Sequence, residues 1–494
     1  EAYLNRGRSY LTLGDHQQAI RNFDTVIRLD SAHSEAYNLR GRSYDKLGEH
    51  QRAIDDFDKI IRLYPNHSEG YKLRGLSYIK LGEHHQAAEN YSKVIELDPT
   101  NAEAYRSRGS SRQQLKNYLG AIKDYNKVIE LDPNNEEAPI KRGTALMALG
   151  QQYFNEGLSF NKVGDHQQAA GSYSKVIELD PSNASAYYNR GVSYDRLGEY
   201  QQAVDDLGKV IKFFPTDAKA YNLRGLSYRN LGEYRRAIED FDRAIELDPV
   251  NREAPQTNKA VAEQRLSRQF LEKAVSDYKL FRFSQAIQGF DKVIEIEPDH
   301  LEAYHKRGVS YEGLGQHEQA IKDYDRVIEL SPTDWTAYNN MSISYMSLGK
   351  YGEAIKGFNK VIELEPTNAG AYNLRGLSYS NSGQHQLALY DFSKVIELAP
   401  NNADAYNRKG LSYANMGQHQ HAIMSYFQSI QINPKNPTAH FNRGSTYYAL
   451  GQYQAAIQSY NKVLQLDSSW SRKNLLYNKR GQSYSRLGLY QQAI

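Results

Sequence analysis

Cysteine is absent from this 494-residue sequence, which excludes disulfide bonds, thiolate nucleophiles and cysteine metal sites. Long apolar runs are absent too: no stretch approaches the about 18 consecutive apolar residues of a membrane helix. Charge runs are also missing, and 61 basic against 58 acidic residues leave a formal net charge of +3. We therefore expect no membrane insertion and no nucleic-acid partner, because the chain offers no basic tail for phosphates. The expected protein is soluble, and these features fit a cytoplasmic and an extracellular location equally well.

Catalytic motifs are missing as well. The sequence has no glycine loop ending in lysine to cradle a phosphate, no helical pair of zinc-binding histidines and no serine elbow flanked by glycines. We expect a protein that is not an enzyme and that uses no cofactor or metal.

Glycine recurs with a period of 34 residues, and this is the strongest pattern in the sequence. It stands at Gly7, Gly41, Gly75 and Gly109, at Gly157, Gly191 and Gly225, and at Gly376, Gly410 and Gly444. A fixed period of this size indicates an array of repeats. With Ala274 and Ser342 in place of glycine, 14 units align, the last cut short. We call this residue the anchor of each unit.

Alanine stands twelve residues after every anchor, and an aromatic residue usually stands sixteen after it, as at Phe23 and Phe392. A position that admits only a methyl group predicts a close helix crossing, where a larger side chain costs about 1–3 kcal/mol. These alanines are Ala19, Ala53, Ala87, Ala121, Ala169, Ala203, Ala237, Ala286, Ala320, Ala354, Ala388, Ala422, Ala456 and Ala493.

Apolar residues spaced by three, four and seven predict two amphipathic helices in each unit. A short turn joins them, and it contains glycine in most units, as at Gly14 and Gly48. Of the 14 prolines, 11 stand where the second helix should end, as at Pro99. Each unit is therefore a helix-turn-helix.

The unit closely resembles the tetratricopeptide repeat, in the form with a tyrosine four residues before the glycine and an arginine directly before it. Examples are Tyr37 with Arg40 and Tyr372 with Arg375. The resemblance covers nearly the whole chain. It implies an all-α fold, a right-handed superhelical α-solenoid of about 13 to 14 repeats whose first helices line a concave groove. Its implied partners are other proteins or peptides.

The period fails twice, where Gly143 lies 14 residues before Gly157 and Lys259 lies 15 before Ala274. Each break adds a first helix without a second. Because no glycine or proline occurs from 256 to 288, the second break predicts one long helix that runs into the next unit. The expected organisation is block one at 1–135 with four repeats, a linking helix at 136–152, block two at 153–251 with three repeats, a linking helix at 252–268, and block three at 269–494 with six repeats and a truncated one.

Two further ladders follow the repeat. Seven histidines share one position nine residues after the anchor, where other units have tyrosine, and we interpret them as packing aromatics: His16, His50, His84, His166, His317, His385 and His419. The arginine before the anchor is expected to pair between repeats with acids at Asp56, Asp124, Asp206, Asp240, Asp323 and Asp391. The alternative is a cationic ridge that binds an acidic ligand, since guanidinium groups bind carboxylates bidentately.

Asparagine is frequent at the positions that line the groove in this family, two and three residues before the anchor. Those three before include Asn38, Asn222, Asn339, Asn373 and Asn407, and those two before include Asn189, Asn340 and Asn442. An amide side chain both donates and accepts hydrogen bonds, so it suits an extended peptide backbone. We predict these eight residues as peptide-binding.

Glycosylation sequons at Asn66 and Asn183 fall in expected inter-repeat loops and are candidate glycan sites if the protein is secreted.

Three functions follow from these patterns. The first is a non-enzymatic scaffold that holds extended peptides or partner helices in its groove. The second is a structural protein that stacks end to end into a superhelical filament, because Ile494 leaves a repeat open. The third is the repeat arm of a larger enzyme such as a glycosyltransferase, because similar repeats in such enzymes carry asparagine two residues before the glycine. The sequence leaves open which ligand is bound, and which of these functions applies.

Overall fold

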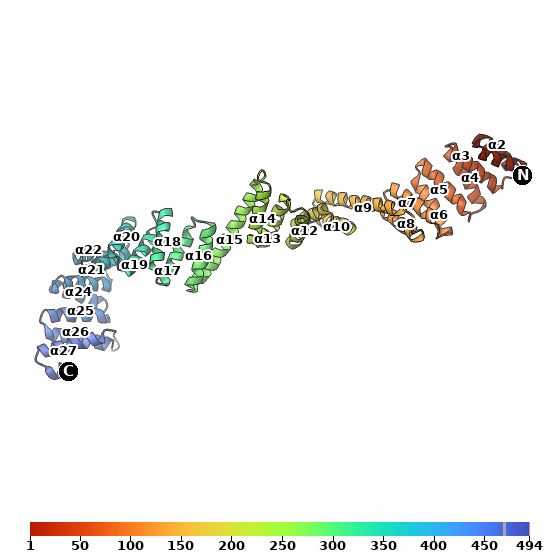
Figure 1. Ribbon diagram of the computed structural model, residues 1–494. Helices are drawn as coiled ribbons and strands as arrows, with labels where there is room; N and C mark the ends of the chain where they lie inside the picture. The colour runs from red at the N-terminus through yellow and green to blue at the C-terminus, as the bar shows by residue number, and fades with distance from the viewer. Residues whose placement is uncertain (468–470, 494) are drawn as a thin grey trace. The chain divides into compact units, whose positions relative to one another are not determined.

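A computed structural model describes residues 1–467 and 471–493, which form helices and turns and no strand (Figure 1). These residues divide into two compact units, one within 1–259 and the other within 260–467 and 471–493. Ile494 and the extra residues around Trp470, for which the sequence predicts a longer loop, lie outside the described part. None of the helices formed by the described residues combines the length and the apolar character that a membrane crossing requires.

The first unit consists of seven helix pairs and the beginning of α15. Its helices are α1 (Ala2–Thr12), α2 (His16–Leu29), α3 (Ser34–Lys46), α4 (His50–Leu63), α5 (Ser68–Leu81), α6 (His84–Leu97), α7 (Ala102–Gln114), α8 (Tyr118–Leu131), α9 (Glu137–Lys162), α10 (His166–Leu179), α11 (Ala184–Leu197), α12 (Tyr200–Phe213), α13 (Ala218–Asn230), α14 (Tyr234–Leu247) and α15 (Glu253–Lys279).

The second unit continues the same alternation of first and second helices. After α15 come α16 (Phe283–Ile296), α17 (Leu301–Gly313), α18 (His317–Leu330), α19 (Trp335–Ser347), α20 (Tyr351–Leu364), α21 (Ala369–Asn381), α22 (His385–Leu398), α23 (Ala403–Asn415), α24 (His419–Ile432), α25 (Pro437–Ala449), α26 (Tyr453–Leu466), α27 (Lys473–Arg486) and the short α28 (Tyr490–Ala493). Apart from α15, each helix packs against its neighbours in the chain. α15 contacts α14 through the pair Lys259–Asp242 and α16 through Ala274, so the expected all-α solenoid of helix-turn-helix repeats is confirmed.

The core of each repeat is the crossing of its two helices. Every alanine at the predicted crossing from Ala19 to Ala456 has no exposed surface, and only Ala493, on the short α28, is partly exposed. The anchor glycine meets the aromatic residue of the second helix: a Cβ on Gly376 would lie 2.9 Å from Cε1 of Phe392. Small residues on one helix therefore pack against large residues of the other, so the interior of each repeat is close-packed.

The turns between paired helices require a left-handed residue. Glycine supplies it in most repeats, with φ of 78° at Gly14 and 81° at Gly383. Lys116 and Phe281 adopt this conformation without being glycine, with φ of 59° and 57°. A side chain in this region costs about 1–2 kcal/mol, so these two turns are strained.

Both breaks in the period are continuous helices. α15 extends without interruption from Glu253 to Lys279, which confirms the predicted long helix, and α9 does the same from Glu137 to Lys162. A Cβ on Gly143, the anchor of the extra helix, would meet nothing within 4 Å, whereas a Cβ on most other anchor glycines would meet an aromatic ring of the second helix. The extra helix therefore has no second helix over its anchor. The three-block division of the chain remains a prediction.

Candidate functional site

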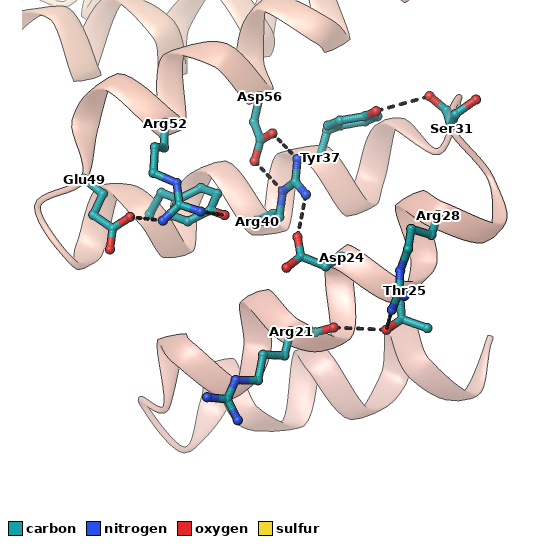
Figure 2. A network of polar contacts seen from close by, with 11 residues as sticks. Arg21, Asp24, Thr25, Arg28, Ser31, Tyr37, Arg40, Glu49, Arg52 and Asp56 are labelled. Atoms are coloured by element: carbon teal, nitrogen blue, oxygen red, sulfur yellow. Dashed lines mark hydrogen bonds and ion pairs between the residues drawn. The ribbon is translucent and has the colours of Figure 1, made fainter.

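The arginine before the anchor lies between two second helices. Arg40 on α3 donates through Nε and Nη2 to both carboxylate oxygens of Asp56 on α4, at 2.9 and 2.6 Å. Its Nη1 donates to Asp24 on α2, at 2.5 Å (Figure 2). Burial alone would lower the pKa of Arg40, but the bonds and charges of Asp56 and Asp24 outweigh it and raise that pKa. The guanidinium is therefore firmly charged.

All six predicted acids bind their arginine in this way. The pairs are Arg40–Asp56, Arg108–Asp124, Arg190–Asp206, Arg224–Asp240, Arg307–Asp323 and Arg375–Asp391. The expectation that these acids pair between repeats was wrong, because each pair lies within one repeat. The link between repeats is instead the residue sixteen before the arginine, such as Asp24, Asp291 or Asn359.

The tyrosine four residues before the anchor belongs to the same cluster. The guanidinium carbon of Arg40 lies 5.5 Å from the centre of the Tyr37 ring, and that of Arg375 lies 5.4 Å from the Tyr372 ring. Each stack keeps the arginine in place for its two acceptors. Because six of these arginines already hold a carboxylate bidentately, the ladder favours a structural role over a cationic ridge for an acidic ligand.

Three of the predicted asparagines stand at one register in consecutive first helices of the second unit. They are Asn339 on α19, Asn373 on α21 and Asn407 on α23, and all three are partly buried. The amide of Asn339 donates to Oδ1 of its neighbour Asn340 at 3.3 Å. The amide of Asn442 on α25 donates to Oδ1 of Asn407 at 3.1 Å, so it joins two repeats. We call these five residues the asparagine row.

Open hydrogen-bonding capacity remains in the asparagine row. Asn373 makes no side-chain hydrogen bond with the described residues, and the amide nitrogen of Asn407 donates to none of them. Arg408, beside Asn407, makes neither a hydrogen bond nor an ion pair through its guanidinium within the described part of the chain. Burial lowers the pKa of Arg408, although Asp404 opposes this. The asparagine row therefore offers free amide groups, and Arg408 beside it adds a cation that forms no ion pair with the described residues.

Family models described as tetratricopeptide repeats match most of the chain. One set matches residues 4–68, 102–135, 184–217, 218–251, 301–334, 369–402, 392–424 and 437–469. Models described as a TPR repeat match 75–116, 157–198, 343–383 and 410–451. The chain belongs to the tetratricopeptide repeat family. Proteins of this family are protein-interaction scaffolds, and this chain is one of them.

Several solved structures are similar to parts or all of the chain. MamA from residue 41 to its end, from Desulfovibrio magneticus RS-1, is 24% identical with a TM-score of 0.33 and covers 35% of this chain and 97% of its own. YrrB, described as a TPR protein with an unusual peptide-binding site, is 24% identical with a TM-score of 0.33, covering 36% and 93%. The anaphase-promoting complex assembly Cut9–Hcn1 is 16% identical with a TM-score of 0.35, covering 97% and 95%. A comparison with curated proteins found no match.

In the first unit the predicted tetratricopeptide groove residues are more scattered. Oδ1 of Asn38 is buried and accepts no hydrogen bond from the described residues. Asn189 donates to the carbonyl of Ser185 on its own helix, at 2.8 Å. Asn222 accepts from Asn258 on α15 at 3.2 Å and lines a pocket of about 270 Å³. The structure does not bring these three together into one row.

A second pocket of the first unit lies at the first break in the tetratricopeptide array. It has a volume of about 390 Å³ and is lined by Met147, Phe154 and other residues of α9, by the end of α10 and by the start of α11. Met147 is exposed, and Phe154 stands three residues before the anchor, where Asn222 stands two repeats later. This pocket therefore combines the apolar side chains of Met147 and Phe154 with the amides of Gln151 and Asn183.

A serine ladder escaped the sequence analysis. Two residues after the anchor every unit has serine, except for Thr446, and the pattern was visible in the alignment. In four repeats the hydroxyl donates to a residue of the preceding first helix. The bonds are Ser77 to Asp45 at 3.0 Å, Ser193 to Asn161 at 3.1 Å, Ser227 to Asp195 at 2.9 Å and Ser344 to Glu312 at 2.6 Å. They fix the spacing of neighbouring first helices.

The seven histidines of the ladder begin second helices and are all partly buried, as expected for packing residues. His50 and His166 also bond through Nδ1 to the first helix of their repeat, His50 to Asp45 at 2.8 Å and His166 to Asn161 at 3.0 Å. The described residues hold no cluster of three or more histidine, aspartate or glutamate side chains placed for a metal ion.

The two candidate glycosylation residues differ in their surroundings. Asn66 is exposed in the loop between α4 and α5. Asn183 is the N-cap of α11, where its Oδ1 accepts from the backbone N–H of Ala186 at 3.0 Å, and it also lines the pocket of 390 Å³. Glycosylation at both residues remains a prediction.

Proposed function

We propose that the chain is a non-enzymatic scaffold that binds extended peptides along the asparagine row of its second unit. The observation that carries this proposal is the recurrence of Asn339, Asn373 and Asn407 at one register on three consecutive first helices. A side-chain amide can donate to a peptide carbonyl and accept from a peptide N–H at the same time. Such contacts read the backbone of the ligand and tolerate many sequences.

The spacing of the row suits an extended chain. Packed helices lie about 8–10 Å apart, and an extended peptide advances about 3.3 Å per residue. One asparagine therefore meets roughly every third residue of the ligand, and side chains between these points need not fit. Arg408, whose guanidinium makes no ion pair with the residues that the structure describes, adds a cation for one acidic group of the ligand.

A peptide-display selection on the immobilised full chain tests this function. Peptides enriched from a library without aspartate and glutamate are titrated against the wild type and the triple variant N339A/N373A/N407A. We expect binding on the order of 100-fold weaker in the triple variant, because three lost hydrogen bonds contribute about 1 kcal/mol each. The melting temperature should change little, because the three side chains are only partly buried.

Matched variants separate a groove from general damage. The triple variant K356A/Q386A/Q420A changes exposed residues of the second helices in the same three repeats, and its affinity should equal that of the wild type. Methylation of the peptide backbone nitrogen at every third residue should weaken binding in one of the three registers. Equal affinity of the wild type and N339A/N373A/N407A would contradict the proposal. End-to-end stacking and a role as an enzyme arm remain predictions from the sequence.

A further inference from the structure

Four large apolar side chains on two second helices of the second unit are exposed. They are Leu387 and Tyr390 on α22, 47% and 65% exposed, and Met424 and Phe427 on α24, 68% and 49% exposed. Both helices pack against α23, which lies between them in the chain. We call these four residues the α22–α24 patch.

The patch departs from the pattern of the repeat. Fourteen residues after the anchor, the position of Tyr390 and Met424, every earlier unit has a polar residue or glycine: Arg21, Asp55, Glu89, Lys123, Gly171, Asp205, Glu239, Gln288, Lys322 and Lys356. One set of exposed apolar residues elsewhere recurs at a turn position, six after the anchor: Leu13, Leu47, Leu81, Leu115, Val163, Leu197, Leu231, Leu280, Leu314 and Leu487. The turn residues follow from the fold, whereas the patch does not. Clustered exposed apolar side chains mark interaction sites.

Phe427 also removes an acceptor from the arginine ladder. It stands sixteen residues before Arg443, where other repeats place the acceptor for Nη1, such as Asp291 for Arg307 at 2.6 Å. The position lies beside the guanidinium even when it carries no acceptor: a Cβ on Gly208 would lie 3.8 Å from Nη1 of Arg224. The register therefore places Phe427 next to Arg443.

Arg443 lacks its second carboxylate too. The position sixteen residues after it holds Ser459, whose Oγ accepts only from Nε, at 3.3 Å. Neither terminal nitrogen of Arg443 makes a hydrogen bond or ion pair with the described residues. Burial lowers the pKa of Arg443, and only a weaker effect of Tyr447 opposes it. A half-buried guanidinium with two free nitrogens thus borders an exposed aromatic residue.

We propose that the α22–α24 patch and Arg443 form a docking surface for an acidic amphipathic helix of a partner protein. The apolar face of that helix covers Leu387, Tyr390, Met424 and Phe427. A carboxylate at its border binds the two terminal nitrogens of Arg443 and takes the place of the missing ladder acid. The patch lies on second helices, and Arg443 on α25 is not part of the asparagine row. The inference therefore goes beyond the peptide-binding row and stands independently of it.

The test is a selection of displayed helical peptides on the full chain, followed by titration of the enriched peptides. The wild type should enrich peptides that carry aspartate or glutamate next to an apolar stripe. Two variants perturb the surface without touching the core: Y390E/M424E places charge in the patch, and F427D restores an internal acceptor for Arg443. Binding should fall at least tenfold in each. K356E, which changes the equivalent exposed position of α20, should bind as the wild type does.

Three results would overturn the proposal: no enrichment on the wild type over Y390E/M424E, enriched peptides without acidic residues, or equal binding to the wild type and F427D. The variant N339A/N373A/N407A distinguishes the two surfaces. It should keep full affinity for the acidic helix, and a loss there would assign that peptide to the asparagine row instead. F427D should fold as the wild type does, because other repeats have aspartate at this position, for example Asp291. Circular dichroism checks this.

Discussion

Removal of Asp391 should destabilise the eleventh repeat strongly. Its carboxylate is fully buried, with an exposed fraction of 0% against 13% for Arg375, and it accepts two bonds from that guanidinium, at 2.9 and 2.6 Å. D391A leaves Arg375 with one neutral partner, Asn359, at 2.7 Å. Breaking a buried pair on one side costs about 3–5 kcal/mol, and the remaining bond to Asn359 places the expected loss near the lower value.

The assay must report on one repeat, because an array of repeats need not unfold in a single step. Native-state hydrogen exchange of amides in α21 and α22 does so. A loss of about 3 kcal/mol corresponds to exchange roughly 150-fold faster.

Two variants in the same repeat complete the experiment. E397A breaks the exposed pair of Glu397 with Lys394, and it should cost less than about 0.5 kcal/mol. The double variant R375L/D391L removes both charges, so it should lose less stability than D391A alone. The reasoning is refuted if D391A exchanges no faster than E397A.

Three smaller predictions concern single repeats. K116G should stabilise the turn between α7 and α8 by about 1 kcal/mol, since Lys116 has a φ of 59°; urea unfolding followed by circular dichroism measures it, and a loss of stability would contradict the strain. A354L should cost about 1–3 kcal/mol, because Ala354 has no exposed surface; a melting temperature equal to that of the wild type would exclude the close crossing. Burial would raise the pKa of Asp45, but bonds from Lys80, His50 and Ser77 lower it overall. This carboxylate therefore stabilises the fold fully above its unfolded pKa of about 3.9, and the contribution is lost as the pH falls through the lower folded value. The stability difference between the wild type and D45N should shrink below about pH 4, and a difference that grows there would show the opposite sign.

Periodic contacts were predictable from the sequence because they repeat at fixed spacing. The alanine crossing and the six aspartates of the arginine ladder each recur in many units, so one structural reason had to hold for all of them. The same logic would have found the serine ladder, which is as regular as the alanines. The error over Asp56 arose because spacing alone does not tell whether an acid belongs to the same second helix or to the next repeat.

Contacts that depend on side-chain geometry were not predictable. The bond between Asn442 and Asn407 requires a particular approach of two first helices. Asn373, at the position equivalent to Asn407, makes no such bond with the described residues. The asparagines of the first unit share the same pattern, yet Asn189 bonds to its own helix. The α22–α24 patch consists of residues that differ from those at the same positions of other repeats. A search for residues shared by all repeats therefore does not find it.

Mapping a bound peptide by hydrogen exchange tests the central claim most directly. A neutral peptide enriched on the wild type is added at saturation, and amide protection is compared with the free protein. Peptide binding along the asparagine row predicts added protection in the first helices α19, α21 and α23, with little change in α20, α22 and α24. Protection confined to the second helices, or an equal pattern in N339A/N373A/N407A, would contradict it.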